Sequence, residues 1–187
     1  MNDETALTDA DGADLIKIAR DTIEAAVTNR PRPVHDAARH PRLQEHRGAF
    51  VTLNQRGRLR GCIGTFLPEN PLLQVVEQMA VAAATKDPRF QPVTDNELAD
   101  IDIEISVLSP LRKTDDPLSL ELGVHGIYIK SGFHAGTYLP QVATEHNMTK
   151  EDFLSSCCAH KAGLEPDAWK DPATDVYLYT AQIFQEK

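Results

Sequence analysis

The sequence contains few cysteines and no secretory signal. Three cysteines in 187 residues, two of them adjacent at Cys157 and Cys158, do not form a disulfide framework. Unpaired cysteines are typical of a reducing compartment. The first residues, MNDETALTDADGAD, are acidic and lack the cationic start and apolar centre of a signal peptide. We therefore expect a cytoplasmic protein.

Positive charge and long apolar runs are also scarce. The chain carries 19 Lys and Arg against 28 Asp and Glu, a formal net charge of -9. Nucleic acids and anionic membrane surfaces attract clustered positive charge, so we expect neither as a partner. The stretch LLQVVEQMAVAAA is interrupted by Gln74, Glu77 and Gln78 and falls short of the roughly 20 apolar residues that a membrane helix needs.

Motifs of the common cofactor classes are absent from the sequence. It has no glycine-rich phosphate loop, nucleophile elbow, zinc-protease motif or dinucleotide fingerprint. We therefore expect no cofactor. The composition, 41% hydrophobic and 25% charged, is that of an ordinary globular chain. We expect residues 1–11 to form a solvated or disordered tail and residues 12–187 to form a single domain.

Hydrophobic periodicity and turn residues predict an α+β fold. Leu15, Ala19 and Ile23 recur at helical spacing, and Asn70 and Pro71 indicate the start of a second helix. The expected helices are residues 15–27, 71–86 and 150–162. The expected strands are residues 48–54, 58–66, 100–110, 123–132, 135–142 and 175–186. Hairpins and helices without regular βαβ alternation favour mostly antiparallel sheets with packed helices.

The segment RLRGCIGTF, residues 58–66, is the most unusual in the chain. Side chains alternate across a strand, so we expect Leu59 and Ile63 to face the core while Arg60 and Cys62 share the other face. The Cα atoms of Arg60 and Cys62 would then lie roughly 7 Å apart. A guanidinium beside a thiol favours the reactive thiolate. This spacing predicts a thiol available for chemistry.

Two glycines flank this cysteine. Gly61 and Gly64 remove side-chain bulk and would let a ligand or another backbone segment approach the strand closely. The alternative is that both glycines mark a bent or tightly packed strand, in which Cys62 is a small buried hydrophobe. The residues alone leave both interpretations open.

A nucleophilic cysteine needs a base, and His125 in GVHG is the best-placed candidate. A histidine in such a turn is equally explained by the hydrogen bonds it makes there. His35, His40 and His46 fit no metal template, and we expect them at the surface. The CCAH run at 157–160 lacks a second ligand pair, so core packing explains it better and we expect no metal.

Other charged residues are candidates for binding. Asp87 and Arg89 in KDPRF form either an anion-binding or acid/base pair or an ion pair that fixes the loop. Glu104 lies on the polar face of its predicted strand. From there it could meet Arg60 across the sheet, and such a pair is more often structural than catalytic.

The motifs together resemble one family, the AMMECR proteins, which include component A of the AmmeMemoRadiSam system. The resemblance covers nearly the whole chain after the tail, in the family's order. The matching segments are LRGCIGTF (59–66), DPRFQPV (87–93), IEISVLSP (103–110), GVHGIYI (123–129), YLPQVA (138–143) and KAGL (161–164).

The resemblance implies two lobes built from related β-rich repeats, with a cleft between them lined by the LRGCIG segment. It also implies Memo-like and radical S-adenosylmethionine proteins as partners. The residues it places near the cleft are Arg60, Gly61, Cys62, Asp87, Arg89, Glu104, His125 and Gln141. Two functions follow as hypotheses. The favoured one is a module that binds a small molecule, peptide or partner; the alternative is an enzyme that uses Cys62 as nucleophile on a small carbonyl or acyl substrate.

Overall fold

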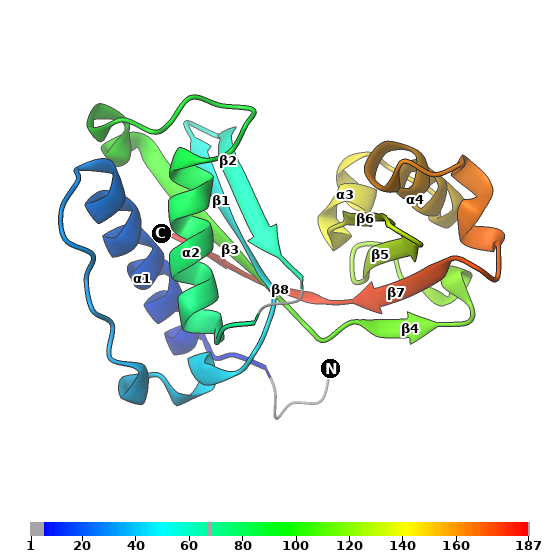
Figure 1. The fold of residues 1–187 in the computed structure, drawn as a ribbon, viewed down its shortest axis with the longest axis horizontal. Coiled ribbons are helices and arrows are strands. Elements are labelled where there is room, and N and C mark those ends of the chain that lie inside the picture. Colours follow the sequence, from blue (N-terminus) through cyan, green and yellow to red (C-terminus); the bar gives the residue numbers. More distant parts are fainter. Residues whose placement is uncertain (1–5, 67–68, 187) are drawn as a thin grey trace. The chain divides into compact units, whose positions relative to one another are not determined.

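The structure is a computed structural model that describes residues 6–66 and 69–186 (Figure 1). The chain divides into two compact units. Unit 1 comprises Met1–Leu108 with Gln182–Lys187, and unit 2 comprises Ser109–Ala181. Each unit contains a four-stranded sheet, which confirms the predicted α+β class with antiparallel pairing. The predicted cleft between two lobes stays a prediction.

The sheet of unit 1 has the strand order β2-β1-β3-β8. Its strands are β1 (Ala49–Gln55), β2 (Arg58–Thr65), β3 (Ile101–Leu108) and β8 (Ala181–Gln185). β1 and β2 form the predicted hairpin, with Gly57 in its turn at φ +74°. β1 also pairs antiparallel with β3, which leaves β2 and β8 as the two edges of this sheet.

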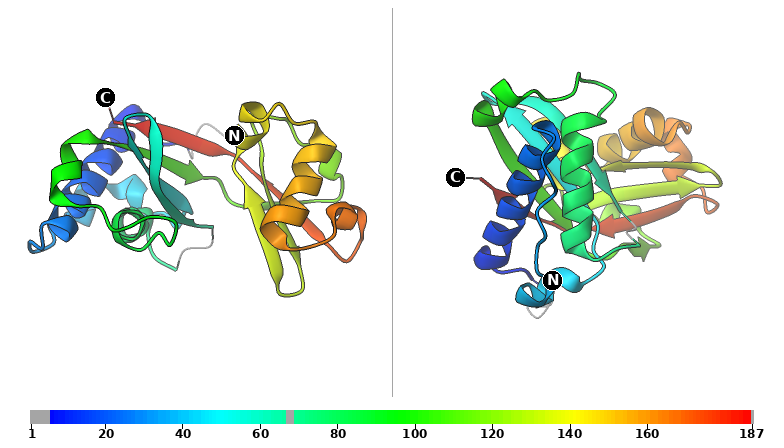
Figure 2. Two further views of the ribbon diagram at one scale, coloured as in Figure 1. Left: turned by 90° about the horizontal axis from the view of Figure 1, so that it is seen from above. Right: turned by 60° about the vertical axis from the view of Figure 1, so that its left-hand side comes forward.

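Two helices, α1 (Asp9–Val27) and α2 (Leu72–Thr85), cover one face of this sheet (Figures 1 and 2). Alternate residues of the strands point into the layer beneath the helices, and Val51, Leu53, Ile103 and Ile105 are at most 1% exposed. This confirms the predicted alternation of the third strand. The buried apolar layer therefore fixes which face of β2 is turned away from the helices.

Both helices begin at positions that differ from the prediction. Thr8 caps α1 in a capping box with Asp11, so the helix includes the last residues of the predicted tail. Leu7 is also buried. The hydrophobic period alone missed this start because it begins only at Leu15. α2 starts at Leu72 without a side-chain cap from Asn70; instead the Leu72 N–H donates to the Glu45 carbonyl at 2.9 Å.

The sheet of unit 2 has the strand order β4-β7-β5-β6. Its strands are β4 (Arg112–Thr114), β5 (Gly126–Ser131), β6 (His134–Tyr138) and β7 (Asp175–Tyr179). It packs with α3 (Pro140–Glu145), α4 (Lys150–Cys157) and a π-helical turn (Cys158–Ala162). As predicted, Thr149 caps α4 and Gly163, at φ +66°, ends the helical segment.

The predicted final strand, residues 175–186, is wrong as one element. It is divided at Thr180 into β7 and β8, which belong to different sheets. Short 3-10 helices occupy Ala37–Arg39, Pro41–Gln44, Asp95–Asp100, Pro117–Ser119 and Pro166–Lys170. Among the described helices, none has the length and apolar character needed to span a bilayer.

Candidate functional site

The LRGCIG segment lies on β2, and a β-bulge interrupts its alternation. Leu53 of β1 pairs with Gly61 and Asn54 pairs with Leu59, so Arg60 is an extra residue in the strand. A bulge of this kind shifts the side-chain alternation by one position. Leu59 therefore shares the face of Asn54 and is 44% exposed. The prediction that Leu59 and Ile63 both face the core is wrong for Leu59.

The two glycines are explained by packing. A Cβ on Gly61 would lie 2.3 Å from the carbonyl oxygen of Ala83 in α2, and a Cβ on Gly64 would lie 2.3 Å from the Phe50 ring. The close approach that Gly61 permits is thus made by the backbone of the covering helix. Gly64 makes room for a cross-strand aromatic ring. Contact of either glycine with a ligand stays a prediction.

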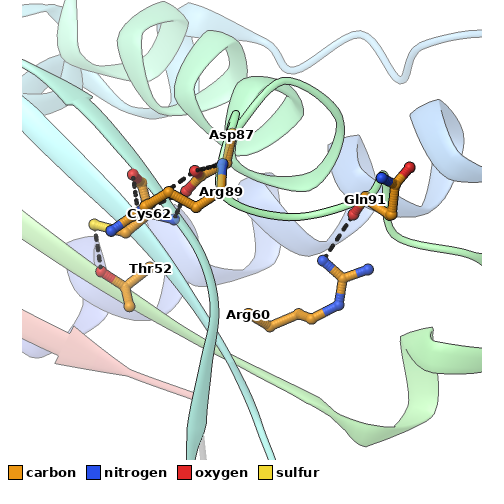
Figure 3. A network of polar contacts seen from close by, with 6 residues as sticks. All are labelled: Thr52, Arg60, Cys62, Asp87, Arg89 and Gln91. Carbon is orange, nitrogen blue, oxygen red and sulfur yellow. Dashed lines mark hydrogen bonds and ion pairs between the residues drawn. The ribbon is translucent and has the colours of Figure 1, made fainter.

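Asp87 and Arg89 hold the backbone of Cys62 between them (Figure 3). The Cys62 N–H donates to Asp87 Oδ2 at 2.9 Å, and Arg89 Nη2 donates to the Cys62 carbonyl at 3.2 Å. The two side chains are joined to each other by an ion pair of 2.6 Å. β2 is an edge strand, so this pair occupies main-chain groups that a further strand would otherwise bind.

The electrostatics of this pair follow from its burial and contacts. The Asp87 side chain is only 2% exposed, and its carboxylate accepts two hydrogen bonds from the Arg89 side chain. These bonds, with the N–H of Cys62, hold the pKa of Asp87 well below its usual range. The same hydrogen bonds raise the pKa of Arg89. The structure therefore supports the loop-fixing interpretation of this ion pair.

Arg60 fixes the same loop from the other side. Its Nε donates to Glu97 Oε1 at 2.8 Å, and its Nη1 donates to the Gln91 carbonyl at 2.9 Å. A further bond of 3.4 Å reaches the Pro92 carbonyl. The Arg60 guanidinium lowers the pKa of Glu97 to about 2. The predicted pairing of Arg60 with Glu104 is wrong, because the bulge and the 3-10 turn at Asp95–Asp100 bring Glu97 into reach instead.

Phe90 joins the two arginines. Its ring centroid lies 6.0 Å from the Arg60 guanidinium carbon and 5.4 Å from that of Arg89. Both distances are in the range of cation–π contacts. Phe90 thus anchors its loop through contacts with both arginines. The LRGCIG and DPRFQPV segments, far apart in the chain, form one connected structure.

The Cys62 thiol is half-buried and does not lie beside the Arg60 guanidinium. Figure 3 shows the sulfur pointing toward Thr52, whereas the Arg60 side chain extends toward Gln91. The Thr52 hydroxyl donates to the sulfur at 3.3 Å. The expected guanidinium–thiol pair is therefore not formed, because Glu97 and two backbone carbonyls engage Arg60.

A polar row crosses the face of the sheet that is turned away from the helices. Thr52 stands opposite both Cys62 and Glu104 in the strand register. Glu104 in turn accepts a hydrogen bond of 2.7 Å from Gln185 of β8. Sequence reasoning found Cys62 and Glu104 but missed Thr52, whose role depends on pairing across β1. It also missed Glu97, although the Thr94–Glu97 capping box is a local signal.

His125 and Gln141 belong to unit 2, whereas Cys62 belongs to unit 1. The Glu121 backbone N–H donates to the ring Nδ1 of His125 at 3.0 Å, and the backbone N–H of His125 donates to the Glu121 carbonyl at 2.9 Å. Burial lowers the pKa of His125, and nearby Arg112 adds to this effect. These bonds give His125 a role in its own turn, and its service as a base for Cys62 stays a prediction. Gln141 lies on α3, where its Oε1 is buried without a hydrogen-bond partner among the described residues.

The remaining candidates are structural. Cys157 and Cys158 are fully buried in the core of unit 2, which confirms the packing interpretation of CCAH, and burial raises the pKa of both thiols. His35 and His40 are less exposed than predicted. His35 Nδ1 lies 2.7 Å from Glu77 Oε1, and His40 Nδ1 lies 2.9 Å from Asp14 Oδ2.

Comparison with known proteins assigns the chain to a family. Residues 16–184 match the model of the AMMECR1 family. A protein of Methanosarcina mazei is 42% identical over 97% of this chain and 94% of its own length, and one of Methanothermobacter thermautotrophicus is 43% identical over 94% of each. The crystal structure of an uncharacterized protein, PH0010, from Pyrococcus horikoshii matches with a TM-score of 0.89 and 36% identity, covering 97% of this chain and 94% of that one. The chain therefore belongs to the AMMECR1 family.

Proposed function

We propose that this chain is a binding protein that contacts its partner through the β2–loop surface, defined as Arg58–Thr65 together with Asp87–Val93. One observation carries the proposal. Arg60 and Arg89 are both engaged by carboxylates and backbone carbonyls of the chain itself. These contacts fix a loop on an edge strand. They also engage the two guanidinium groups that could otherwise stabilise a Cys62 thiolate. The arrangement favours a rigid recognition surface over a catalytic site.

The side chains that this surface exposes suit a protein partner. Leu59 is 44% exposed, and the Arg89 side chain is 52% exposed beside the half-buried Phe90. Arginine and aromatic side chains are enriched in protein–protein interfaces, where they supply contact area and charge-assisted hydrogen bonds. A partner surface with apolar groups and carboxylates would complement this combination. A peptide or small molecule with the same groups is covered by the same proposal.

The partners we propose are the Memo-like and radical S-adenosylmethionine proteins that the family resemblance implies. We expect the chain to bind them in the cytoplasm.

The test measures binding of each purified partner by isothermal titration calorimetry. Leu59→Asp places a charge on the exposed part of the surface without touching the contacts of Arg60 or Arg89, and we expect it to weaken binding at least tenfold. Val34→Asp is the matched control, because Val34 is 97% exposed on a different segment of the same unit. Equal affinities of Leu59→Asp and the unmodified chain would reject this surface. Absence of binding by both partners would reject their assignment.

An enzyme that uses Cys62 as nucleophile on a small carbonyl or acyl substrate is the second candidate. The observation that favours it is the Thr52 hydroxyl, which donates to the sulfur at 3.3 Å and would support a developing negative charge there. The discriminating measurement is the rate of Cys62 alkylation against pH, with Cys62→Ser as the control for the other thiols. A midpoint near the ordinary thiol value of about 8.5 would count against an activated nucleophile.

A further inference from the structure

A groove in unit 1 lies between the start of α1 and the edge strand β8, away from the β2–loop surface. Its volume is about 450 Å³. Asp9, Gly12, Ala13 and Ile16 of α1 line one side, and residues 183–186 line the other. The groove therefore joins an apolar helix face to the open edge of a sheet.

The floor of the groove depends on a glycine inside a helix. A Cβ on Gly12 would lie 2.1 Å from the Phe184 ring, so the ring rests directly on the helix backbone. Glycine within a helix is unfavourable relative to alanine, and the contact with Phe184 explains why it stands here. Phe184 is only half-buried, and the neighbouring Ile183 is 46% exposed. Apolar surface thus remains accessible along the groove.

The backbone of β8 presents hydrogen-bonding groups to this groove. The Glu186 N–H donates to the Ile103 carbonyl of β3 at 2.9 Å. Main-chain groups alternate in direction along a strand, so those of Phe184 also face β3, whereas those of Ile183 and Gln185 face away. β8 is the last strand of the sheet formed by the described residues. An added strand could pair with Ile183 and Gln185.

The two edges of this sheet differ. At β2 the Asp87–Arg89 pair binds the outward N–H and carbonyl of Cys62. In the described part of the chain, no comparable side chain binds the outward main-chain groups of Ile183 or Gln185. Proteins commonly close an edge strand against unwanted pairing, and an accessible edge beside an apolar groove is the geometry that strand addition uses.

Charge indicates the occupant. The exposed Asp9 lines the groove, and the chain carries a net charge of -9. The exposed Asp102 lies on the neighbouring strand β3, on the face of the sheet turned away from the helices, whereas the Glu186 carboxylate is already bound by Arg20. A second copy of the chain would bring the same carboxylates against each other. We infer that this groove binds an extended peptide segment of a partner protein, with alternating apolar and basic residues, as an added strand along β8. The apolar side chains would all project to the helix-covered face and contact Phe184, and the basic ones would project to the opposite face of the sheet, where Asp102 lies.

The test uses a synthetic peptide of sequence KVRVKVRV with blocked termini. Two control peptides are EVDVEVDV, which reverses the charge, and KVRVKVRV methylated at alternate backbone nitrogens, which removes the donors along one edge. By calorimetry we expect the basic peptide to bind, more weakly as salt increases, and each control to bind at least tenfold more weakly. Equal binding of the methylated peptide would overturn strand addition, and equal binding of the acidic peptide would overturn the charge assignment.

A protein variant tests the strand itself. Ile183→Pro removes an outward N–H that does not bond to β3, and proline is tolerated at such edge positions. We expect it to fold, by circular dichroism and thermal melting, and to lose at least tenfold in affinity for the basic peptide. Hydrogen exchange of the unmodified chain gives a readout that does not depend on this variant folding, because peptide binding should protect the amides of Ile183 and Gln185. Unprotected amides would overturn the inference, and so would a dimer in light scattering that the peptide does not dissociate.

Discussion

The carboxylate of Asp87 accepts a hydrogen bond of 2.9 Å from the backbone N–H of Cys62, a residue 25 positions earlier in the chain. The same carboxylate binds the Arg89 guanidinium, which in turn donates a hydrogen bond to the carbonyl of Cys62. Two segments that look like separate motifs in the sequence are therefore one structure. Its polar residues position the backbone of the strand and loop.

Replacing Asp87 by asparagine should destabilise unit 1. The substitution removes a charged acceptor from a buried position and leaves the Arg89 guanidinium without its partner. Hydrogen bonds to charged groups are worth about 1.5–3 kcal/mol each, and the exposure of Arg89 offsets part of the loss, so we expect a decrease of about 2 kcal/mol in the free energy of unfolding. Urea denaturation measures this quantity. Asp95→Asn, at an exposed position of the next turn, is the control and should change it by less than about 0.5 kcal/mol.

The acid limb of the stability curve should depend on Asp87 and Glu97. Folding lowers the pKa of both carboxyls, that of Glu97 to about 2. Unfolded chains bind these protons at pH values near 4, so the stabilisation is fully present above about pH 4.5 and is lost as the pH falls toward 2. Denaturation at a series of pH values should show a shallower decline for Asp87→Asn and Glu97→Gln than for the unmodified chain. Parallel curves for all three proteins would contradict this linkage.

Arg60→Ala should loosen the loop more than it lowers global stability. The guanidinium makes bonds to two successive backbone carbonyls, and lysine cannot reproduce this planar arrangement. We expect faster hydrogen exchange of the backbone amides of residues 89–91 and of Val93 in both Arg60→Ala and Arg60→Lys. Arg56→Ala removes only an exposed ion pair with Asp100 and serves as the control. If Arg60→Lys protects the loop as well as arginine does, charge alone holds it.

Gly61→Ala should be destabilising although it adds only one methyl group. The new Cβ would lie 2.3 Å from the Ala83 carbonyl oxygen, and a backbone atom in a helix cannot move aside as a side chain does. Overpacking of this kind costs about 1–3 kcal/mol. Thermal melting measures the effect, with Arg58→Ala on the same strand as a control. A melting temperature equal to that of the unmodified chain would show that α2 can shift away from β2.

Local sequence signals predicted most of the elements but few of their partners. The alternation of Ile101–Val107, the turn at Gly57 and the cap at Thr149 act within a few residues, so each is visible in the sequence. The bulge at Arg60 depends on the register of β1 and is not visible there. The choice of Glu97 over Glu104 as the partner of Arg60 follows from that bulge.

The division of the last strand has the same explanation. Residues 175–186 contain no proline or glycine that would mark a break at Thr180, so the sequence alone predicts one strand. Only the pairing of β7 with β4 and β5, and the place of β8 beside β3, separates the two parts. The boundary between β7 and β8 is therefore set by the strands with which each pairs, and the strand propensity of the residues does not reveal it.

The segment Asp175–Gln185 supplies one strand to each sheet, and β7 is an interior strand of its sheet. During synthesis on the ribosome, neither sheet can acquire its full set of strands until this segment has emerged. Folding of both units is therefore completed late, and until then the strands of a nascent chain lack partners and present unpaired edges of the kind that aggregate.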